Sequence, residues 1–170
     1  MRSPLFIFTR TLTLALTLGL MLLAFRPAAA AQKEIPFRED AGLTKAEYLL
    51  SAGQFSAALD TAGEVLLRHP DNADAYTYRG YAYSRLGETA EAAKNFKKAL
   101  LLNPTHLGAN YYLAGLYLDS GDVQRAIEQL QVIRMACGHT DCEELRSLER
   151  DIDRFKRGDP AKKVEPKKEE

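Results

Sequence analysis

The sequence predicts an all-α protein built as a solenoid of antiparallel helix pairs, with about seven helices in all. Three observations lead to this prediction. Glycines recur at a constant interval, at Gly53, Gly87 and Gly121, and alanines recur at the same interval five positions later. Apolar residues return every three or four positions after each glycine, as they do along one face of a helix. A sequence repeat of about 34 residues is typical of stacked helical units.

Residues 1–31 have the features of a secretory signal peptide. Arg2 and Arg10 precede an uncharged run at 11–25, which is followed by four alanines at 28–31. A basic N-terminal region, a short apolar region and small residues at the cleavage site are typical of cleaved export signals. The apolar run is also too short for a membrane-spanning helix. We therefore expect an exported, periplasmic protein with no stable membrane insertion after cleavage. An uncleaved N-terminal anchor is the alternative.

The charge balance changes when the signal peptide is set apart. The whole sequence has 170 residues and a formal net charge of zero, with 23 basic and 23 acidic side chains. Residues 1–31 hold three arginines and no acid, so the chain from 32 to 170 carries a net charge of −3. A mildly acidic exported chain is not typical of nucleic-acid-binding proteins, and we expect no nucleic-acid partner.

Each repeat predicts a helix, a turn and a second helix. The units cover 39–72, 73–106 and 107–138, after a lead-in at 32–38. Helices are expected at 73–86 and 88–102 in the second unit, and at 107–120 and 123–136 in the third. The glycine ends the first helix in a left-handed conformation, which other residues adopt only at a cost. Pro70 and Pro104 follow the second helices, because proline cannot continue a helix, and Gly138 replaces the third proline.

These residues resemble the tetratricopeptide repeat family. The second unit matches the family pattern best, through Tyr76, Gly80, Tyr83, Gly87, Ala92, Phe96, Ala99 and Pro104. The resemblance covers 39–138, which is most of the chain that follows the signal peptide. It implies a right-handed superhelix of three units, in which the first helices line a concave groove that takes an extended peptide or a partner's helix.

Carried over by register, the resemblance also implies which residues line the groove. They are Leu43, Glu47, Leu50, Asp74, Thr77, Tyr81, Arg85, Gly108, Tyr111, Gly115 and Leu118. Because Tyr76 and Tyr83 are expected in the core, Tyr81 and Tyr111 should point elsewhere, and exposed tyrosines near an arginine are typical interface anchors. The residues with which some family members clamp the carboxylate of chaperone tails are absent here. Binding by the convex face and homo-oligomerisation are left open.

A closing helix and a tail are expected after the last repeat. The segment 139–158 carries an apolar stripe among charges, formed by Leu145, Leu148, Ile152 and Phe155. Such a polar-faced helix is what the end of a repeat array needs. Thr140 and Glu143 have the spacing of a capping box. The segment 159–170 is charged, has one sizeable apolar side chain and predicts a disordered tail.

Two cysteines, Cys137 and Cys142, flank the turn before the closing helix. Behind a signal peptide, an even count at short spacing favours a structural disulfide bond. Two alternatives stay open. Cys137, His139 and Cys142 would form a soft-metal site that lacks the usual fourth ligand, and thiol chemistry would depart from the Cys-x-x-Cys spacing that lowers the pKa of a thiol.

No motif in the sequence assembles an active site. His69 and His106 flank the repeat prolines and are expected to be solvated turn residues. We find no phosphate-binding loop, nucleophile elbow or zinc-protease motif, and we expect no enzyme and no cofactor. The sequence thus predicts a non-catalytic adaptor, scaffold or assembly factor of the bacterial periplasm. The alternative is a metal- or thiol-handling accessory factor that uses Cys137, His139 and Cys142.

Overall fold

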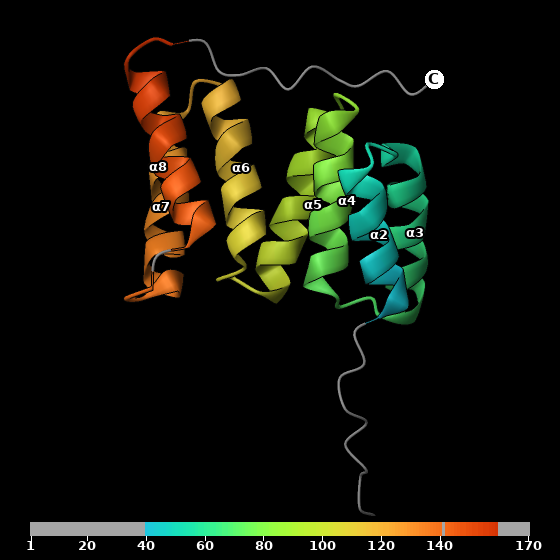
Figure 1. Ribbon diagram of the computed structural model, residues 1–170. Helices are drawn as coiled ribbons and strands as arrows, with labels where there is room; N and C mark the ends of the chain where they lie inside the picture. Colours follow the sequence, from blue (N-terminus) through green and yellow to red (C-terminus); the bar gives the residue numbers. More distant parts are fainter. Residues whose placement is uncertain (1–39, 141, 160–170) are drawn as a thin grey trace, which may run out of the picture. The chain divides into compact units, whose positions relative to one another are not determined.

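The computed structural model describes residues 40–140 and 142–159, which form seven α-helices and no strand (Figure 1). The helices are α2 (Ala41–Ser51), α3 (Phe55–Arg68), α4 (Ala73–Arg85), α5 (Thr89–Leu102), α6 (Leu107–Asp119), α7 (Val123–Cys137) and α8 (Glu143–Lys156). The all-α helix-pair solenoid is confirmed. In the second and third units the helices begin and end within one position of the prediction. The predicted signal peptide and lead-in, and most of the predicted tail, lie outside the described residues.

The three repeat glycines adopt the left-handed conformation that the sequence predicts. Their φ angles are 77° at Gly53, 84° at Gly87 and 80° at Gly121. The residue after each glycine donates its amide hydrogen to a carbonyl in the last turn of the preceding helix; Glu88, for example, donates to Tyr83 at 2.9 Å. This bond satisfies a carbonyl that would otherwise lack a partner at the helix end. Three equal turns therefore give three helix pairs of the same geometry.

The helices form two rows. In the inner row, α2 contacts α4, α4 contacts α6, and α6 contacts α8. The outer row consists of α3, α5 and α7, which within the described part of the chain contact inner helices but not each other. In Figure 1 the helix pairs follow one another in chain order. Because only the inner helices approach one another directly, the inner row forms the concave side of the stack.

Small residues allow the two helices of a pair to pack closely. Ala58, Ala92 and Ala126 occupy the same position of successive repeats and are fully buried. In the second unit Gly80 of α4 lies against the buried ring of Phe96 on α5, and a Cβ atom at Gly80 would come within 2.5 Å of that ring. In the second unit, close packing thus depends on a residue without a side chain on one helix, which leaves room for a large ring on the other.

The closing helix α8 covers the last pair. Leu148 and Ile152 are buried and Leu145 is half-buried against α6 and α7, whereas Phe155 is 36% exposed. The predicted capping box is wrong. The hydroxyl of Thr140 donates to the carbonyl oxygen of Cys137 at 2.6 Å, and α8 begins after Cys142 without a side-chain cap. Thr140, which the spacing in the sequence assigned to the start of α8, therefore forms a hydrogen bond at the end of α7 instead.

Among the described residues, no helix is both long enough and apolar enough to cross a membrane.

Candidate binding face

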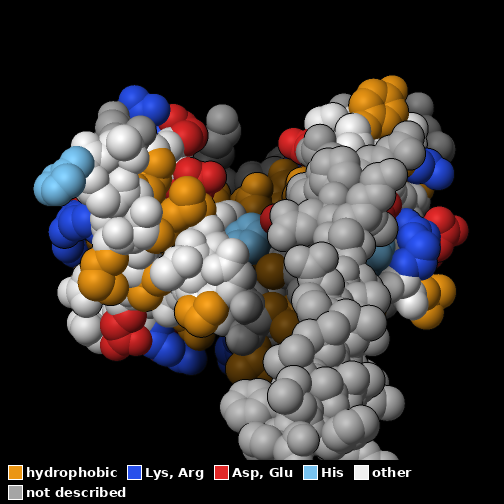
Figure 2. Space-filling view, turned by 90° about the horizontal axis from the view of Figure 1, so that it is seen from below, with side chains coloured by type: hydrophobic (Ala, Val, Ile, Leu, Met, Phe, Trp, Pro, Cys, Tyr) orange, Lys and Arg blue, Asp and Glu red, His pale blue; other side chains and the backbone are white. Residues whose placement is uncertain are grey.

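The exposed side of α2, α4, α6 and α8 forms the surface that we call the inner face. Figure 2, seen from below, shows a hollow between the two flanks of the stack, with hydrophobic side chains at its floor. This is the side on which the register of the repeats placed a groove.

The structure distributes the predicted groove residues over three environments. Glu47 and Asp74 are exposed or partly exposed at the rim. A second group is half-buried and consists of Leu50, Tyr81, Arg85, Tyr111, Gly108 and Gly115. The third group is buried: Thr77 is 2% exposed, Leu118 is 7% exposed and Leu43 is 6% exposed. These three side chains pack inside the stack, because helical register places them where neighbouring helices meet. They do not offer a free surface to a ligand.

Three tyrosines of α4 and α6 form a continuous row, which we call the aromatic ladder and which consists of Tyr81, Tyr112 and Tyr111. The ring centroids of Tyr81 and Tyr112 are 4.9 Å apart, and those of Tyr112 and Tyr111 are 5.3 Å apart. Phe55 meets Tyr81 edge-on at 6.4 Å, and Phe96 stacks on Tyr112 at 5.7 Å. Such tilted and edge-to-face pairs are favourable aromatic geometries. The ladder is therefore anchored to the core on one side and half-exposed on the other.

Arg85 adds a positive charge at the end of the ladder. Its Nη1 atom donates to the Tyr81 hydroxyl at 2.9 Å, and its guanidinium carbon lies 4.7 Å from the centroid of the Phe55 ring. Stacking on an aromatic face holds a guanidinium in a fixed orientation. The buried Nε atom has no hydrogen-bond partner, and no carboxylate of the described residues pairs with this side chain. Arg85 is thus an oriented cation without an anionic partner.

At the other end of the ladder, Tyr111 is fastened to the closing helix. Its hydroxyl donates to Oδ2 of Asp151 at 3.2 Å. Burial, and then the negative charge of Asp151, raise the pKa of Tyr111 to about 12. Burial likewise raises the pKa of Tyr112, with further contributions from Tyr81 and Glu144. Tyr81 and Tyr111 thus lie half-buried against the core, and both hydroxyls already have partners within the protein.

The Tyr111 hydroxyl gives a pH-dependent prediction. The folded pKa, about 12, is above the ordinary value of 10.0. The contribution of this group to stability is therefore fully present below pH 10, and it is lost as the pH rises towards 12. We expect Tyr111→Phe to remove a late component from the tyrosinate absorbance titration, and to reduce the loss of stability between those pH values. If Tyr111→Phe instead removed a component of the titration at the ordinary tyrosine pKa of 10.0, this result would contradict the contact with Asp151.

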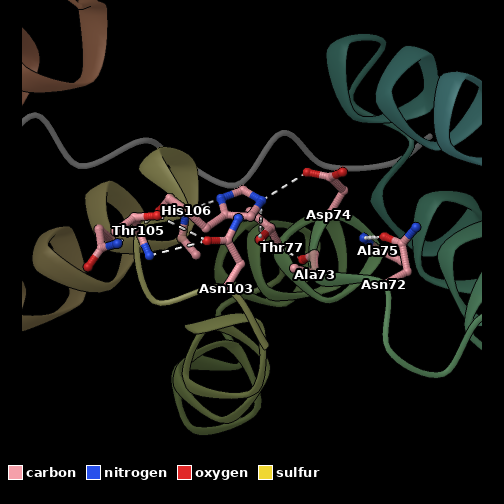
Figure 3. Close-up of polar contacts among 10 residues, drawn as sticks. Asn72, Ala73, Asp74, Ala75, Thr77, Asn103, Thr105 and His106 are labelled. Carbon is pink, nitrogen blue, oxygen red and sulfur yellow. Dashed lines mark hydrogen bonds and ion pairs between the residues drawn. The ribbon is translucent and has the colours of Figure 1, made fainter. Parts of the chain in front are cut away.

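The turn between α5 and α6 holds a second polar centre, shown in Figure 3. Nδ1 of His106 accepts the amide hydrogen of Ala109 at 3.2 Å and so caps α6. Nε2 of His106 lies 2.9 Å from Oδ1 of Asp74 on α4, and this hydrogen bond lowers the pKa of Asp74. The expectation that His106 is a solvated turn residue is wrong, because its ring is largely buried and links α4 to the start of α6. His69, in contrast, is exposed, with its ring near Asp40.

The group formed by Asp74, His106 and Thr77 contains the residue types of a catalytic triad but not its geometry. The Thr77 hydroxyl and the Asp74 carboxylate both lie near the same ring nitrogen, Nε2 of His106, at 3.4 and 2.9 Å. The other ring nitrogen accepts a backbone hydrogen, and the hydroxyl donates to the carbonyl oxygen of Ala73. A triad needs the carboxylate on one ring nitrogen and the nucleophile on the other. This group positions helices.

Replacing His106 should therefore affect stability in two separable ways. We expect His106→Ala to lower the free energy of unfolding by about 1–2 kcal/mol, because it removes the α6 cap together with the link to Asp74. His106→Asn keeps a capping side chain and should cost about 0.5 kcal/mol. Urea denaturation of both variants measures the difference. If His106→Ala and His106→Asn lost the same free energy of unfolding, the α6 cap would contribute little to stability.

The two cysteines lie at the end of α7 and at the start of α8. The sulfur atoms of Cys137 and Cys142 are at disulfide-bonding distance, with their Cα atoms 6.2 Å apart. The side chain of His139, between them in sequence, is exposed. Within residues 40–140 and 142–159, no three His, Cys, Asp or Glu side chains are arranged to hold a metal ion.

A stack of helix pairs that follows the sequence repeat, with an open inner face, defines a helical repeat protein of the kind that binds other proteins. Two sequence profiles, both described as tetratricopeptide repeat, match residues 43–94 and 83–150. This chain belongs to the tetratricopeptide repeat family. Domains of this family are in general non-catalytic modules of protein–protein interaction.

Curated relatives resemble only part of this chain. A tetratricopeptide repeat and J domain-containing co-chaperone, DNJ1, of Fusarium oxysporum f. sp. lycopersici is 38% identical over 87 residues, which are 51% of this chain and 17% of that protein. DnaJ protein P58IPK homolog B of Oryza sativa subsp. japonica is 36% identical over 66 residues, which are 39% of this chain and 14% of that protein. The chain thus matches less than a fifth of the length of either relative.

Solved structures show the same fold. The type III secretion translocator chaperone SycD of Yersinia enterocolitica superposes with a TM-score of 0.61 at 11% identity, over 69% of this chain and 82% of that one. The Sgt2 TPR domain of Aspergillus fumigatus gives a TM-score of 0.59 at 24% identity, over 74% of this chain and 87% of that one.

Sequence reasoning missed three residues that organise the inner face: Tyr112, His106 and Asp151. Tyr112 is adjacent to Tyr111, and register alone does not show that both rings belong to one row. Asn72 and His106 cap α4 and α6 from equivalent positions of successive repeats. That equivalence was a visible signal that His106 caps a helix.

Proposed function

We propose that this protein is a non-catalytic adaptor of the bacterial periplasm, which binds a peptide or a helix of another protein on its inner face. The observation that carries the proposal is the half-exposed aromatic ladder with Arg85 at its end. Aromatic side chains and arginine are the residue types that contribute most binding energy at protein interfaces. Their arrangement on the concave side of a repeat stack suits a narrow ligand.

The contacts of the ladder also indicate how such a ligand would be held. Tyr81 and Tyr112 are fixed by neighbouring rings, so that binding does not have to order them first. The guanidinium of Arg85 is oriented by Phe55 and Tyr81, and no carboxylate of the described residues forms an ion pair with it. We therefore propose a bound segment that carries an apolar or aromatic side chain next to a carboxylate.

A photo-crosslinking experiment tests the face that is used. A photoreactive amino acid is placed at Glu47 on the inner helix α2 and, as a control, at Glu128 on the outer helix α7. In the native compartment we expect one defined partner to be captured from Glu47 and not from Glu128. Capture from Glu128 alone would place binding on the outer face and overturn the proposal.

The captured segment then allows a direct measurement of the role of Arg85. Arg85→Gln should weaken binding of the synthetic segment about tenfold or more, because it removes the charge that faces the carboxylate. Arg85→Lys keeps the charge but loses the planar stacking on Phe55, so that an intermediate affinity is expected. Unchanged affinity for the glutamine variant would exclude Arg85 as the anchor.

The location and the cysteine chemistry need their own test. We propose that residues 1–31 direct export and that Cys137 and Cys142 are bridged in the oxidising compartment. Intact mass spectrometry under non-reducing conditions should show a chain that begins near residue 32 and lacks two hydrogens relative to its reduced form. A retained N terminus would favour an anchor, and a bound metal would favour the metal-handling alternative.

A further inference from the structure

Three large apolar side chains are exposed at the same position of successive repeats. Leu67 on α3, Leu101 on α5 and Met135 on α7 are separated by the repeat interval, and they are 87%, 75% and 74% exposed. Single exposed apolar residues are ordinary on protein surfaces, whereas a set at one register forms a row. This row lies on the outer helices, away from the inner face.

The charged residues beside this row differ between repeats in a regular way. Asp60 and Glu64 precede Leu67 on one side of α3, at the spacing that places residues on the same helix face. Lys94 and Lys98 hold the equivalent positions on α5. All four side chains are exposed. Two repeat units thus present the same apolar residue with opposite charges next to it.

Little within the described part of the chain neutralises these charges. The carboxylates of Asp60 and Glu64 have no cation within salt-bridge distance there. Nζ of Lys94 lies 3.4 Å from Glu91 in an exposed contact on the same helix. Nζ of Lys98 lies 6.0 Å from the centroid of the Tyr76 ring. The outer helices α3 and α5 therefore carry complementary charges, of which the acids of α3 have no cationic partner among the described residues and the lysines of α5 have only exposed contacts within their own repeat.

We propose that a second copy of this chain docks on the outer side of α3 and α5, related to the first by a two-fold axis parallel to these helices. Such a rotation keeps each residue at its level along the helix and places the partner's α5 opposite α3. Asp60 then faces the partner's Lys94, Glu64 faces the partner's Lys98, and Leu67 faces the partner's Leu101. Two-fold symmetry forms every one of these contacts twice.

The charges favour this arrangement over other occupants of the row. Stacking α5 on the partner's α5 would oppose lysines to lysines, and stacking α3 on the partner's α3 would oppose acids to acids. An anionic membrane surface would be repelled by the acids of α3. On α7, the equivalent positions are Glu128 and Val132, which carry a single charge. The pairing leaves α7 and the inner face free, so that the dimer and the proposed adaptor function are independent.

Sedimentation velocity over a range of protein concentrations tests the dimer. We expect a reversible monomer–dimer equilibrium that weakens as salt is added, because exposed ion pairs are screened. The variants K94E/K98E and D60K/E64K should each lower the association constant about tenfold or more, since like charges then face each other. Mixing the two variants should restore a heterodimer, in which opposed pairs again have opposite signs.

Matched apolar variants test which part of the row is used. Leu101→Ser should weaken the dimer, whereas Met135→Ser, an equally exposed position outside the pairing, should leave it unchanged. Circular dichroism checks that all variants stay folded. A monomer at every concentration, failure of the mixed variants to associate, or equal effects of the two serine substitutions would each overturn the proposal.

Discussion

Phe96→Ala is expected to lower the free energy of unfolding by about 3–5 kcal/mol, the largest effect of any single truncation proposed for this protein. The Phe96 ring is fully buried, faces Gly80 on α4 and stacks on Tyr112 of α6. Its removal leaves a cavity at the contact between the second and third repeats, where helices fixed by three equal turns cannot readily collapse. Urea denaturation, followed by circular dichroism, measures the loss.

A matched variant distinguishes the cavity from a general effect of mutation at Phe96. Phe96→Leu retains most of the apolar volume and should cost about 1–2 kcal/mol. In a repeat stack each unit is stabilised by its neighbours, so that hydrogen exchange in α6 should also become faster in the alanine variant. A loss below about 1.5 kcal/mol for Phe96→Ala would mean that neighbouring side chains fill the space.

Gly80→Ala should destabilise the protein by about 1–3 kcal/mol, which is the opposite of the usual effect of this substitution in a helix. Alanine is normally favoured over glycine within a helix by about 1 kcal/mol. At Gly80, however, the new Cβ would come within 2.5 Å of Cε1 of Phe96, and a fully buried ring has little room to move. The overlap outweighs the gain in helix propensity.

Gly63 provides the control for this substitution. It also lies inside a helix, α3, but no atom lies within 4 Å of the place that a Cβ would take there. Gly63→Ala should therefore stabilise the protein by about 0.5–1 kcal/mol. In the double variant Gly80→Ala with Phe96→Leu, the two losses should not add, because the smaller side chain relieves the overlap. Stabilisation by Gly80→Ala would contradict the close approach of α4 and α5.

The features that the sequence predicts best are those fixed by local chemistry and repeated at every unit. Gly87 sits where a helix must end in a left-handed conformation, and Ala92 sits where two helices cross, so that spacing alone located both. Spacing did not predict the contact correctly where one side chain could bond to the end of either of two neighbouring helices. Thr140 has the right distance from Glu143 for a capping box, yet its hydroxyl bonds to the preceding helix.

The inner face is only partly predictable for a related reason. Register indicates which side of a helix faces inward, but it does not show how far a neighbouring helix extends over that side. Register therefore predicts both Thr77 and Arg85 in the groove, whereas Thr77 is buried and Arg85 lies half-buried at the end of the ladder. Tyr111 likewise does not offer a free hydroxyl, because it is bonded to Asp151 of the closing helix.

The sequence by itself determined the all-α repeat architecture, the positions of its turns and the family to which it belongs. These follow from residue types that act within one unit, such as a glycine at a turn or an alanine at a helix crossing. Only the tertiary structure decided which side chains are available to a partner. Exposure depends on contacts between helices that are distant in the sequence, as when His106 at the start of α6 bonds to Asp74 of α4. Contacts of that kind leave no fixed spacing in the sequence.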